Sequence, residues 1–124
     1  MIKFLYFRDV STLADDDATN DSVCWPASSL MGMEPIHDSR LTLYFRQVKN
    51  VFTTAQEEGT GRCDTVTLNL TTVNTHKTAM NAIANAISYN KSSFIVIADD
   101  VNTEYLDGSG IADVRSIVVR AENS

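Results

Sequence analysis

The sequence predicts an α+β fold that is mainly β, and three observations support it. Several short segments alternate apolar and polar residues, one longer segment has apolar residues at three- and four-residue spacing, and glycine, proline or acidic residues separate them. One helix cannot supply the crossovers of a parallel α/β fold. We therefore expect a small, strongly bent antiparallel sheet or partly open barrel with one amphipathic helix over about 74–90, in a single domain covering 1–124.

Candidate strands in the first half of the chain are apolar runs that end at proline or acidic residues. The segment 2–10 is apolar on both faces, which is typical of a strand covered on both sides. The acidic stretch 11–22 that follows is expected to be a solvent loop. Pro26 and Pro35 should end pairing because proline lacks a backbone donor. Further strands are predicted over 23–25, 30–34 and 41–48.

The second half of the chain holds the clearest strand pattern. In 65–71, Val66, Leu68 and Leu70 point to one face, and threonine and asparagine side chains point to the other, which should be wet or meet a partner. The segment 94–98 is wholly apolar, which favours a strand buried on both faces. A closing strand is expected over 114–120, and turns are expected over 50–64 and 99–110.

The one predicted helix has both a start signal and an apolar stripe. Asn74 or Thr75 has the side chain of an N-cap, because its oxygen can accept a hydrogen bond from the first turn. Residues at three- and four-residue spacing place apolar side chains on one face of a helix. The stripe consists of Met80, Ile83, Ala84 and Ile87.

The composition is acidic, with 16 Asp and Glu against 10 Lys and Arg and a net charge of −6. Such a chain repels phosphate backbones and anionic lipids, so nucleic acid is a disfavoured partner. Lys3 and Arg8 break the apolar segment 1–8, and no cleavage site of small residues follows, which favours a strand over a signal peptide. No apolar run approaches the roughly 20 residues that span a bilayer. We expect no membrane partner and a cytoplasmic or assembly-bound location.

Two cysteines and two histidines provide the residue types of a zinc site or a thiol nucleophile. These residues are Cys24, His37, Cys63 and His76. None forms the close pairs that fix two zinc ligands on one turn, and no local signature of a cysteine nucleophile is present. We expect reduced thiols, with Cys24 packed in the core beside Trp25.

An acidic loop late in the chain carries oxygen atoms of the kind that bind calcium or magnesium. Its oxygen-bearing residues are Asp99, Asp100, Asn102, Glu104 and Asp107. Aligned from Asp100, the calcium-binding EF-hand loop requires glycine where Tyr105 stands and glutamate where Ala112 stands. A solvated turn is the commoner meaning of such a run. We therefore predict no metal-binding, cofactor-binding or catalytic residues, with an enzyme using Cys63 or Asp100 as the least favoured hypothesis.

An alternative function is a ligand-binding or single-stranded nucleic-acid-binding β-barrel module. It would require a basic groove built from Arg8, Arg40, Arg46, Lys49 and Arg62. Its stacking platform would come from Phe4, Tyr6, Phe7, Tyr44 and Phe45. Core packing is the favoured role of these aromatic residues, because a stacking groove needs positive charge.

Four segments together carry a resemblance to a known class of proteins. They are 23–30 (VCWPASSL), 41–45 (LTLYF), the helix 75–87 and 94–100 (FIVIADD). Over most of the chain after Asp21 their pattern and order resemble small virion structural proteins of marine tailed phages, such as cyanophages. The resemblance implies a non-enzymatic homo-oligomer located in the virion, with other virion proteins as partners, and a small Sm-like barrel that closes into a ring. The acidic charge departs from an RNA-binding Sm ring.

Overall fold

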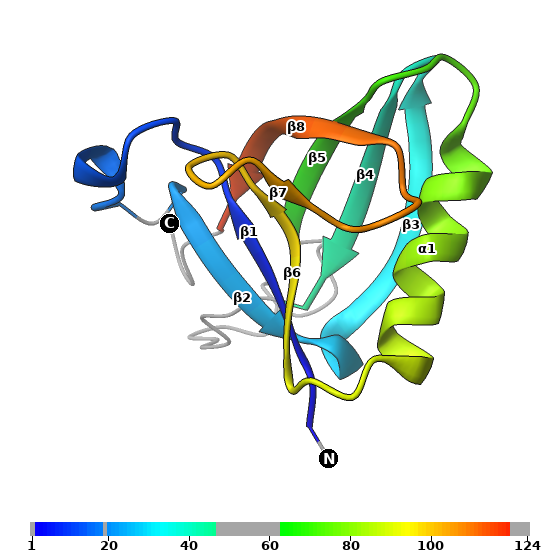
Figure 1. Cartoon of the computed structure of the whole chain (residues 1–124), viewed down its shortest axis with the longest axis horizontal. Coiled ribbons are helices and arrows are strands. Elements are labelled where there is room, and N and C mark those ends of the chain that lie inside the picture. The colour runs from blue at the N-terminus through cyan, green and yellow to red at the C-terminus, as the bar shows by residue number, and fades with distance from the viewer. Residues whose placement is uncertain (1, 19, 47–62, 120–124) are drawn as a thin grey trace, which may run out of the picture.

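The computed structural model describes residues 2–18, 20–46 and 63–119, which form two four-stranded sheets and one α-helix (Figure 1). Sheet A has the strand order β2-β1-β6-β7 and sheet B the order β3-β4-β5-β8. The strands of sheet A are β2 (Ser22–Pro26), β1 (Phe4–Arg8), β6 (Phe94–Asp99) and β7 (Glu104–Tyr105). Those of sheet B are β3 (Leu30–His37), β4 (Arg40–Phe45), β5 (Asp64–Leu70) and β8 (Ile111–Val118). Short 3-10 helices η1 (Leu13–Asp15) and η2 (Ala27–Ser29) flank β2.

The mainly β prediction is confirmed, but the sheet arrangement differs from it. The strands form two sheets that are not closed into a barrel. The prediction of antiparallel pairing throughout is also wrong, because β1 and β6 are parallel. The chain leaves sheet B after β5, passes through α1 (His76–Tyr89), and enters sheet A beside β1 in the direction that β1 runs (Figure 1). The helix thus forms the connection that brings β6 into sheet A in the same direction as β1.

Several element boundaries lie elsewhere than predicted. Strand β3 continues through Pro35 to His37, because it is an edge strand, where a missing donor is tolerated. Strand β8 begins at Ile111, before the predicted 114, and β7 lies inside the predicted turn 99–110. The acidic stretch 11–22 includes η1 and the first residue of β2. Most of the predicted turn 50–64 and the last residues of 41–48 and 114–120 lie outside the described residues.

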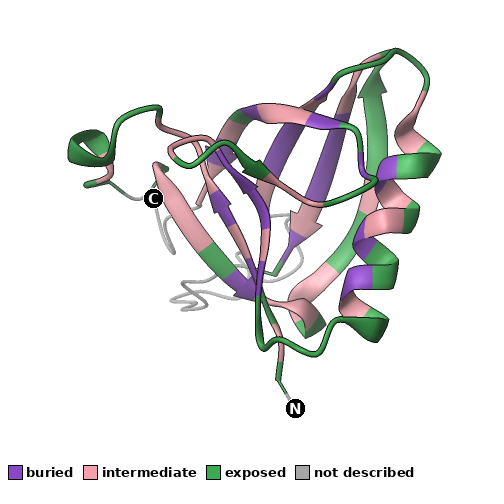
Figure 2. Ribbon diagram, viewed as in Figure 1, coloured by how far each residue is buried: buried purple, intermediate pink, exposed green. Residues whose placement is uncertain are grey.

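Buried side chains from both sheets and from α1 form one core (Figure 2). The alternation predicted in 65–71 is confirmed on its apolar side, since the three aliphatic residues of β5 are buried. The polar side is only partly wet, because the Thr67 hydroxyl is buried and lies 2.9 Å from the hydroxyl of Thr42 on β4. The largest fully buried apolar residues are Trp25, Phe7, Phe45, Leu5, Leu41, Leu43, Leu68, Ile83, Ile95, Ile97 and Val66.

Three of the four predicted stripe residues of helix α1 face the core: Ile83 is buried, and Met80 and Ile87 are partly buried against it. Ala84 is exposed instead, and the sequence missed Ala79 and Ala86, which are buried. Thr75 occupies the N-cap position, but its hydroxyl donates to the Thr72 carbonyl and makes no cap hydrogen bond. Within the described ranges, no helix combines the length and the apolar character that crossing a bilayer requires.

An aromatic cluster joins the two sheets at the centre of this core. The Trp25 ring of β2 stacks on the Phe45 ring of β4, with centroids 4.1 Å apart and planes 4° from parallel. Phe7 of β1 packs edge-on against both. The indole Nε1 of Trp25 donates a hydrogen bond of 3.0 Å to the carboxylate of Asp64, which is fully buried at the start of β5. Sheet A is thus joined to sheet B by stacking and by a polar contact that needs one orientation of the indole.

Replacing Trp25 with Phe should lower the free energy of unfolding by about 2–4 kcal/mol, because it leaves a cavity and removes the donor that Asp64 accepts. Urea denaturation followed by circular dichroism measures the change. Tyr89→Phe, which alters an exposed aromatic residue, serves as the control and should change stability by less than about 0.5 kcal/mol. Equal stability of Trp25→Phe and the wild type would contradict a structural role for this contact.

Candidate interaction surface

The outer face of sheet A has rows of side chains that the strand register sets side by side. Residues paired across neighbouring strands share a face of the sheet. One row runs from Pro26 through Phe4 to Phe94, and the next runs from Cys24 through Tyr6 to Val96. A third row joins Ser22, Arg8 and Asp99. Two apolar rows therefore adjoin one charged row on a single open face.

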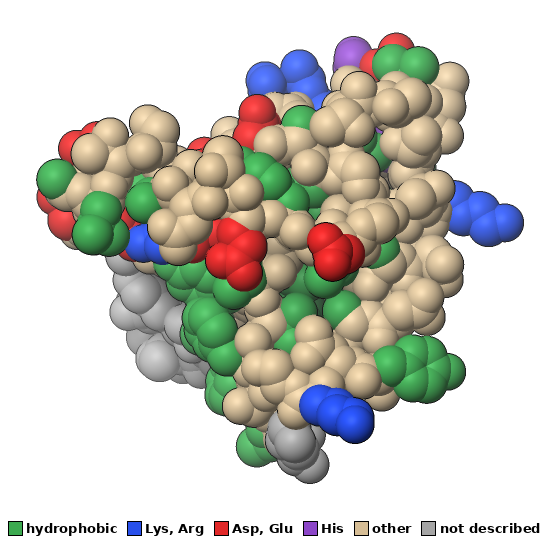
Figure 3. All heavy atoms as spheres, viewed as in Figure 1, with side chains coloured by type: hydrophobic (Ala, Val, Ile, Leu, Met, Phe, Trp, Pro, Cys, Tyr) green, Lys and Arg blue, Asp and Glu red, His purple; other side chains and the backbone are tan. Residues whose placement is uncertain are grey.

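The apolar rows are exposed to solvent to a degree that the sequence did not predict. Phe4 is 36% exposed and Phe94 is 49% exposed, although 94–98 was predicted to be buried on both faces. That prediction is wrong because only the inner face of β6, with Ile95 and Ile97, packs on the core. The rings of Tyr6 and Phe94 are 5.1 Å apart, and burial raises the pKa of Tyr6 above its ordinary value. Figure 3 shows hydrophobic side chains over β1 and β2.

Cys24 lies in one of these exposed rows. Its side chain projects from the outer face of β2 opposite Tyr6 and is exposed, which corrects the prediction that it packs in the core. The reason is strand alternation: Trp25, the next residue, points into the core, so Cys24 must point out. An apolar run as short as 23–25 does not reveal which of its residues faces inward.

The charged row is internally neutralised. The Arg8 guanidinium donates two hydrogen bonds of 2.8 Å to the carboxylate of Asp99, which is 2% exposed, and a longer one of 3.3 Å to Asp16. The Arg8 hydrogen bonds hold the pKa of Asp99 below its ordinary value despite burial. The backbone amides of Val101 and Asn102 also donate to Asp99. The Arg8 guanidinium is therefore paired with carboxylates of the same chain.

Three of the four sheet edges in the described residues are shortened, irregular or covered. Strand β7 has two residues. The backbone N–H of Val114 in β8 donates to Asp100, and β8 packs against β6 and β7. Strand β3 contains Pro35, has register shifts at Met31 and Ile36, and lies beside α1 (Figure 1). Such features prevent another strand from pairing.

Strand β2 is the exception. It shows no register shift and pairs with β1 alone within the described residues. The amide of Asp9 donates to the carbonyl of Asp21, and the amide of Ala27 donates to the carbonyl of Lys3. In an antiparallel ladder every second residue bonds to the neighbouring strand, so these two bonds show which residues of β2 face β1. Val23 and Trp25 therefore bond to β1. The backbone donors and acceptors of Ser22 and Cys24 point away from the sheet, as does the carbonyl of Pro26.

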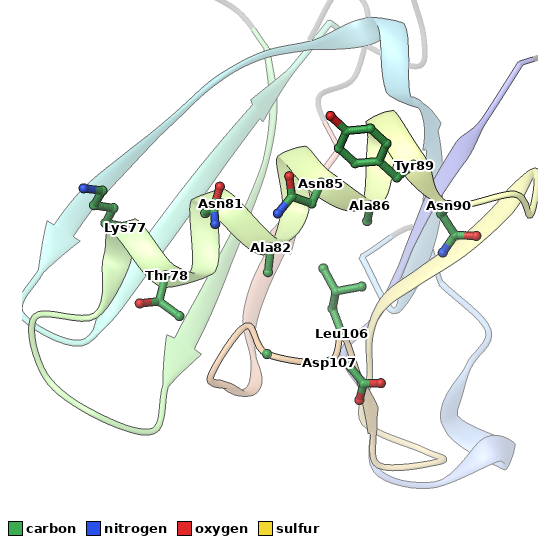
Figure 4. A pocket seen from close by; sticks show the side chains of 11 residues that line it. Lys77, Thr78, Asn81, Ala82, Asn85, Ala86, Tyr89, Asn90, Leu106 and Asp107 are labelled. Carbon is green, nitrogen blue, oxygen red and sulfur yellow. The ribbon is translucent and has the colours of Figure 1, made fainter.

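A groove of about 710 Å³ lies between α1 and the loop after β7 (Figure 4). Its walls include Thr78, Ala82 and Ala86 of α1 on one side and Leu106 on the other. Asn81, Asn85 and Asn90 provide amide groups, and Lys77, Tyr89, Asp107 and Gly108 complete the lining. None of the described residues that line it is a histidine or a cysteine. The groove offers hydrogen bonds to a small polar ligand.

The acidic loop uses its first two carboxylates inside the protein. Asp99 binds Arg8 and its own loop, as above, while Asp100 accepts hydrogen bonds from the Tyr105 hydroxyl at 2.7 Å and from Val114. Burial raises the pKa of Asp100. Asn102 donates a side-chain hydrogen bond to Asp99, while Glu104 and Asp107 are exposed. In the described part of the chain, no three His, Cys, Asp or Glu side chains are placed to hold a metal ion.

The two cysteines are associated with different sheets, apart from each other, whereas the two histidines lie side by side. Cys24 lies in sheet A, whereas Cys63 precedes β5 in sheet B. The two histidines are neighbours: Nε2 of His76, the first residue of α1, lies 2.7 Å from the carbonyl of His37, and Nδ1 of His37 lies 2.7 Å from the Asp38 carboxylate.

The described residues of the hypothetical basic groove and aromatic platform are divided between the two sheets and the core. Arg8 lies in sheet A, whereas Arg40 and Arg46 lie at the two ends of β4 in sheet B. Lys49 and Arg62 lie outside the described residues. Of the five aromatic residues, Phe7 and Phe45 are buried, Phe4 and Tyr6 lie on the outer face, and the Tyr44 hydroxyl donates to Glu34.

Sequence reasoning missed the two features that define this surface, the Arg8–Asp99 pair and the open edge of β2. A signal for the first was present, since a lone arginine ending an apolar strand and an acidic pair ending another are natural partners at one sheet end. No signal identifies an edge strand before strand order is known. Comparisons with protein-family models, curated proteins and solved structures find no match for this chain.

Asp9, which follows β1, should make stability depend on pH. Burial, followed by the charges of Asp100, Asp113 and Asp21, raises the pKa of Asp9 to about 6. The folded state thus binds this proton more tightly than the unfolded state, whose pKa is about 3.9. The stabilising contribution is present at low pH and is lost as pH rises from about 4 to about 6.

Asp9→Asn should therefore be more stable than the wild type at pH 7.5, by about 1 kcal/mol after allowance for solvent screening. The difference should disappear near pH 4. Thermal unfolding across pH 4–8 measures it, with Asp107→Asn, at an exposed carboxylate, as the control. A stability difference that stays constant with pH would contradict the assignment.

Proposed function

We propose that this chain is a non-enzymatic structural protein that forms homo-oligomers through the β2 edge of sheet A, as a component of a phage virion. The open edge of β2 is the observation that carries the proposal. A regular strand with unpaired backbone groups is a template for another strand, and its pairing satisfies those groups. The other described edges are shortened, irregular or covered, so β2 is the one edge among the described strands that is suited to such pairing.

The apolar outer face beside β2 supports the same function. Edge pairing between copies extends sheet A and sets the outer faces of neighbouring copies next to each other. The exposed rings of Phe4 and Phe94 then belong to a wider apolar surface, which further copies or other virion proteins would cover. The virion location rests on the resemblance noted in the sequence, to which this geometry adds a means of self-association.

The groove beside α1 supports a second candidate function, the binding of a small polar ligand. Its three asparagine side chains can each donate and accept hydrogen bonds. Ligand-induced stabilisation of the wild type, absent in Asn85→Leu, would support this function. The open-edge observation favours self-association, because it concerns backbone groups that pairing would satisfy.

The absolute mass in solution, measured by light scattering on a sizing column across a range of protein concentrations, tests self-association. We expect a discrete multimer that survives dilution. Cys24→Pro removes one of the two outward backbone donors of β2, that of residue 24, without removing a hydrogen bond to β1, and proline is tolerated in edge strands. This variant should weaken self-association by about tenfold or more, since each dimer loses two hydrogen bonds and gains steric conflict.

Cys24→Ser is the matched control, because it changes the same exposed side chain and keeps the donor. It should remain oligomeric. Circular dichroism and thermal unfolding confirm that Cys24→Pro is folded, and hydrogen exchange of the Ser22 and Cys24 amides in the wild type gives a second readout that does not depend on the variant. A wild-type monomer at every concentration would exclude self-association, and rapid exchange of both amides in a stable oligomer would exclude the β2 edge.

A further inference from the structure

We infer that the partner of β2 is β2 of a second copy, antiparallel and related by a two-fold axis that passes beside Val23. This inference rests on the proposed function and specifies its contact. In the paired arrangement, Ser22 of one copy lies opposite Cys24 of the other, and sheet A continues across the axis as an eight-stranded sheet. The contact is isologous, because the same patch serves both copies.

The register follows from which backbone groups are free. Two residues opposite each other in an antiparallel ladder exchange both of their bonds when their donors and acceptors face each other. Among the described residues, the backbone donors and acceptors of Ser22 and Cys24 pair with no other strand, whereas Pro26 has only a carbonyl. In a register centred on Val23, Ser22 of each copy lies opposite Cys24 of the other copy. The two copies then use every outward backbone donor and acceptor of these two residues. A register centred on Cys24 instead sets Ser22 against Pro26 and leaves the Ser22 carbonyl without a donor.

The distribution of charge favours the antiparallel direction. One end of β2 adjoins the acidic stretch with Asp15, Asp16, Asp17 and Asp21. The other end lies next to Lys3, which precedes β1 and whose ammonium donates to the Ile87 carbonyl of α1. Antiparallel pairing brings the acidic end of each copy to the basic end of its partner, whereas parallel pairing would place the two acidic ends together.

Side chains near the axis are compatible with close approach. Val23 would face its counterpart across the axis as a pair that does not exchange hydrogen bonds, where side chains come closest. It is half-buried, apolar and packed at the margin of the core. On the outer face, the small side chains of Ser22 and Cys24 would alternate across the junction. No bulky or charged side chain of β2 projects between the two strands.

Disulfide formation between single cysteines tests the arrangement. Three proteins, all carrying Cys63→Ala, place the one cysteine at position 22, 23 or 24: Ser22→Cys with Cys24→Ser, Val23→Cys with Cys24→Ser, and the native Cys24. In the inferred register the two residues 23 are directly opposite, with Cα atoms about 4.5–5.5 Å apart, within the range of a disulfide. Residue 22 of one copy is diagonal to residue 22 of the other, and the same holds for residue 24, so each such pair is about 7–8 Å apart. In a glutathione buffer the position-23 protein should form crosslinked dimers at least tenfold faster than the others.

The outcomes separate this inference from the proposed function. Fastest crosslinking at position 24, or at position 22, would overturn the register and place the axis at that residue. An oligomer in which none of the three crosslinks would overturn the β2–β2 contact while self-association stands. A monomer for all three proteins and for the wild type would overturn both. Reducing agent should return each crosslinked protein to its original mass, which shows that the link is the disulfide.

Discussion

The contact between Trp25 and Asp64 is the constraint on which the arrangement of the two sheets depends. The indole reaches from β2 in sheet A into the core, stacks on Phe45 of sheet B and donates to the fully buried carboxylate of Asp64. A buried carboxylate is costly unless it is hydrogen-bonded, so the donor and acceptor must stay in place together. This fixes the face of β2 that points inward, and with it the outward direction of Cys24 and the free direction of its backbone groups.

Two successive carboxylates at the end of β6 form a second set of contacts between elements, and they bind different partners. Asp99 points to the outer face and holds Arg8 in a two-pronged ion pair, while Asp100 points toward sheet B and accepts from Tyr105 and from the backbone of β8. Asp99 is the last residue of β6, whereas Asp100 begins the turn that follows, so the chain changes direction between them. The Asp-Asp pair therefore closes the β7 and β8 side of the molecule. In the described residues, the outer edge of β2 has no equivalent pair of carboxylates and pairs with no other strand.

The sequence predicted local structure well where a pattern repeats and poorly where strand order decides. Alternation in 65–71 and helical spacing in 74–90 correspond to β5 and α1, because each pattern extends over enough residues to fix a period. The apolar run 94–98 fits a central strand, and β6 is one, yet its outer face is open because nothing in the described residues packs on it. The parallel pairing with β1 and the separation into two sheets depend on contacts between distant segments. No local pattern encodes them.

For the candidate surface, too, the sequence predicted the residue types but not their position in the fold. The aromatic residues of the outer face were visible in the sequence, but their exposure depends on which face of sheet A packs on the core. The inner faces of the two sheets and one face of α1 form that core, which leaves Phe4 and Phe94 side by side on the outer face of sheet A. Other exposed apolar residues lie elsewhere, among them Met31 and Ile36 on β3 and Tyr89 on α1. Removal of such a face from water favours association whatever the partner, whereas backbone pairing at β2 determines position and direction. Apolar contact thus supplies a non-directional driving force, and the hydrogen-bonding edge with its oppositely charged ends supplies the specificity.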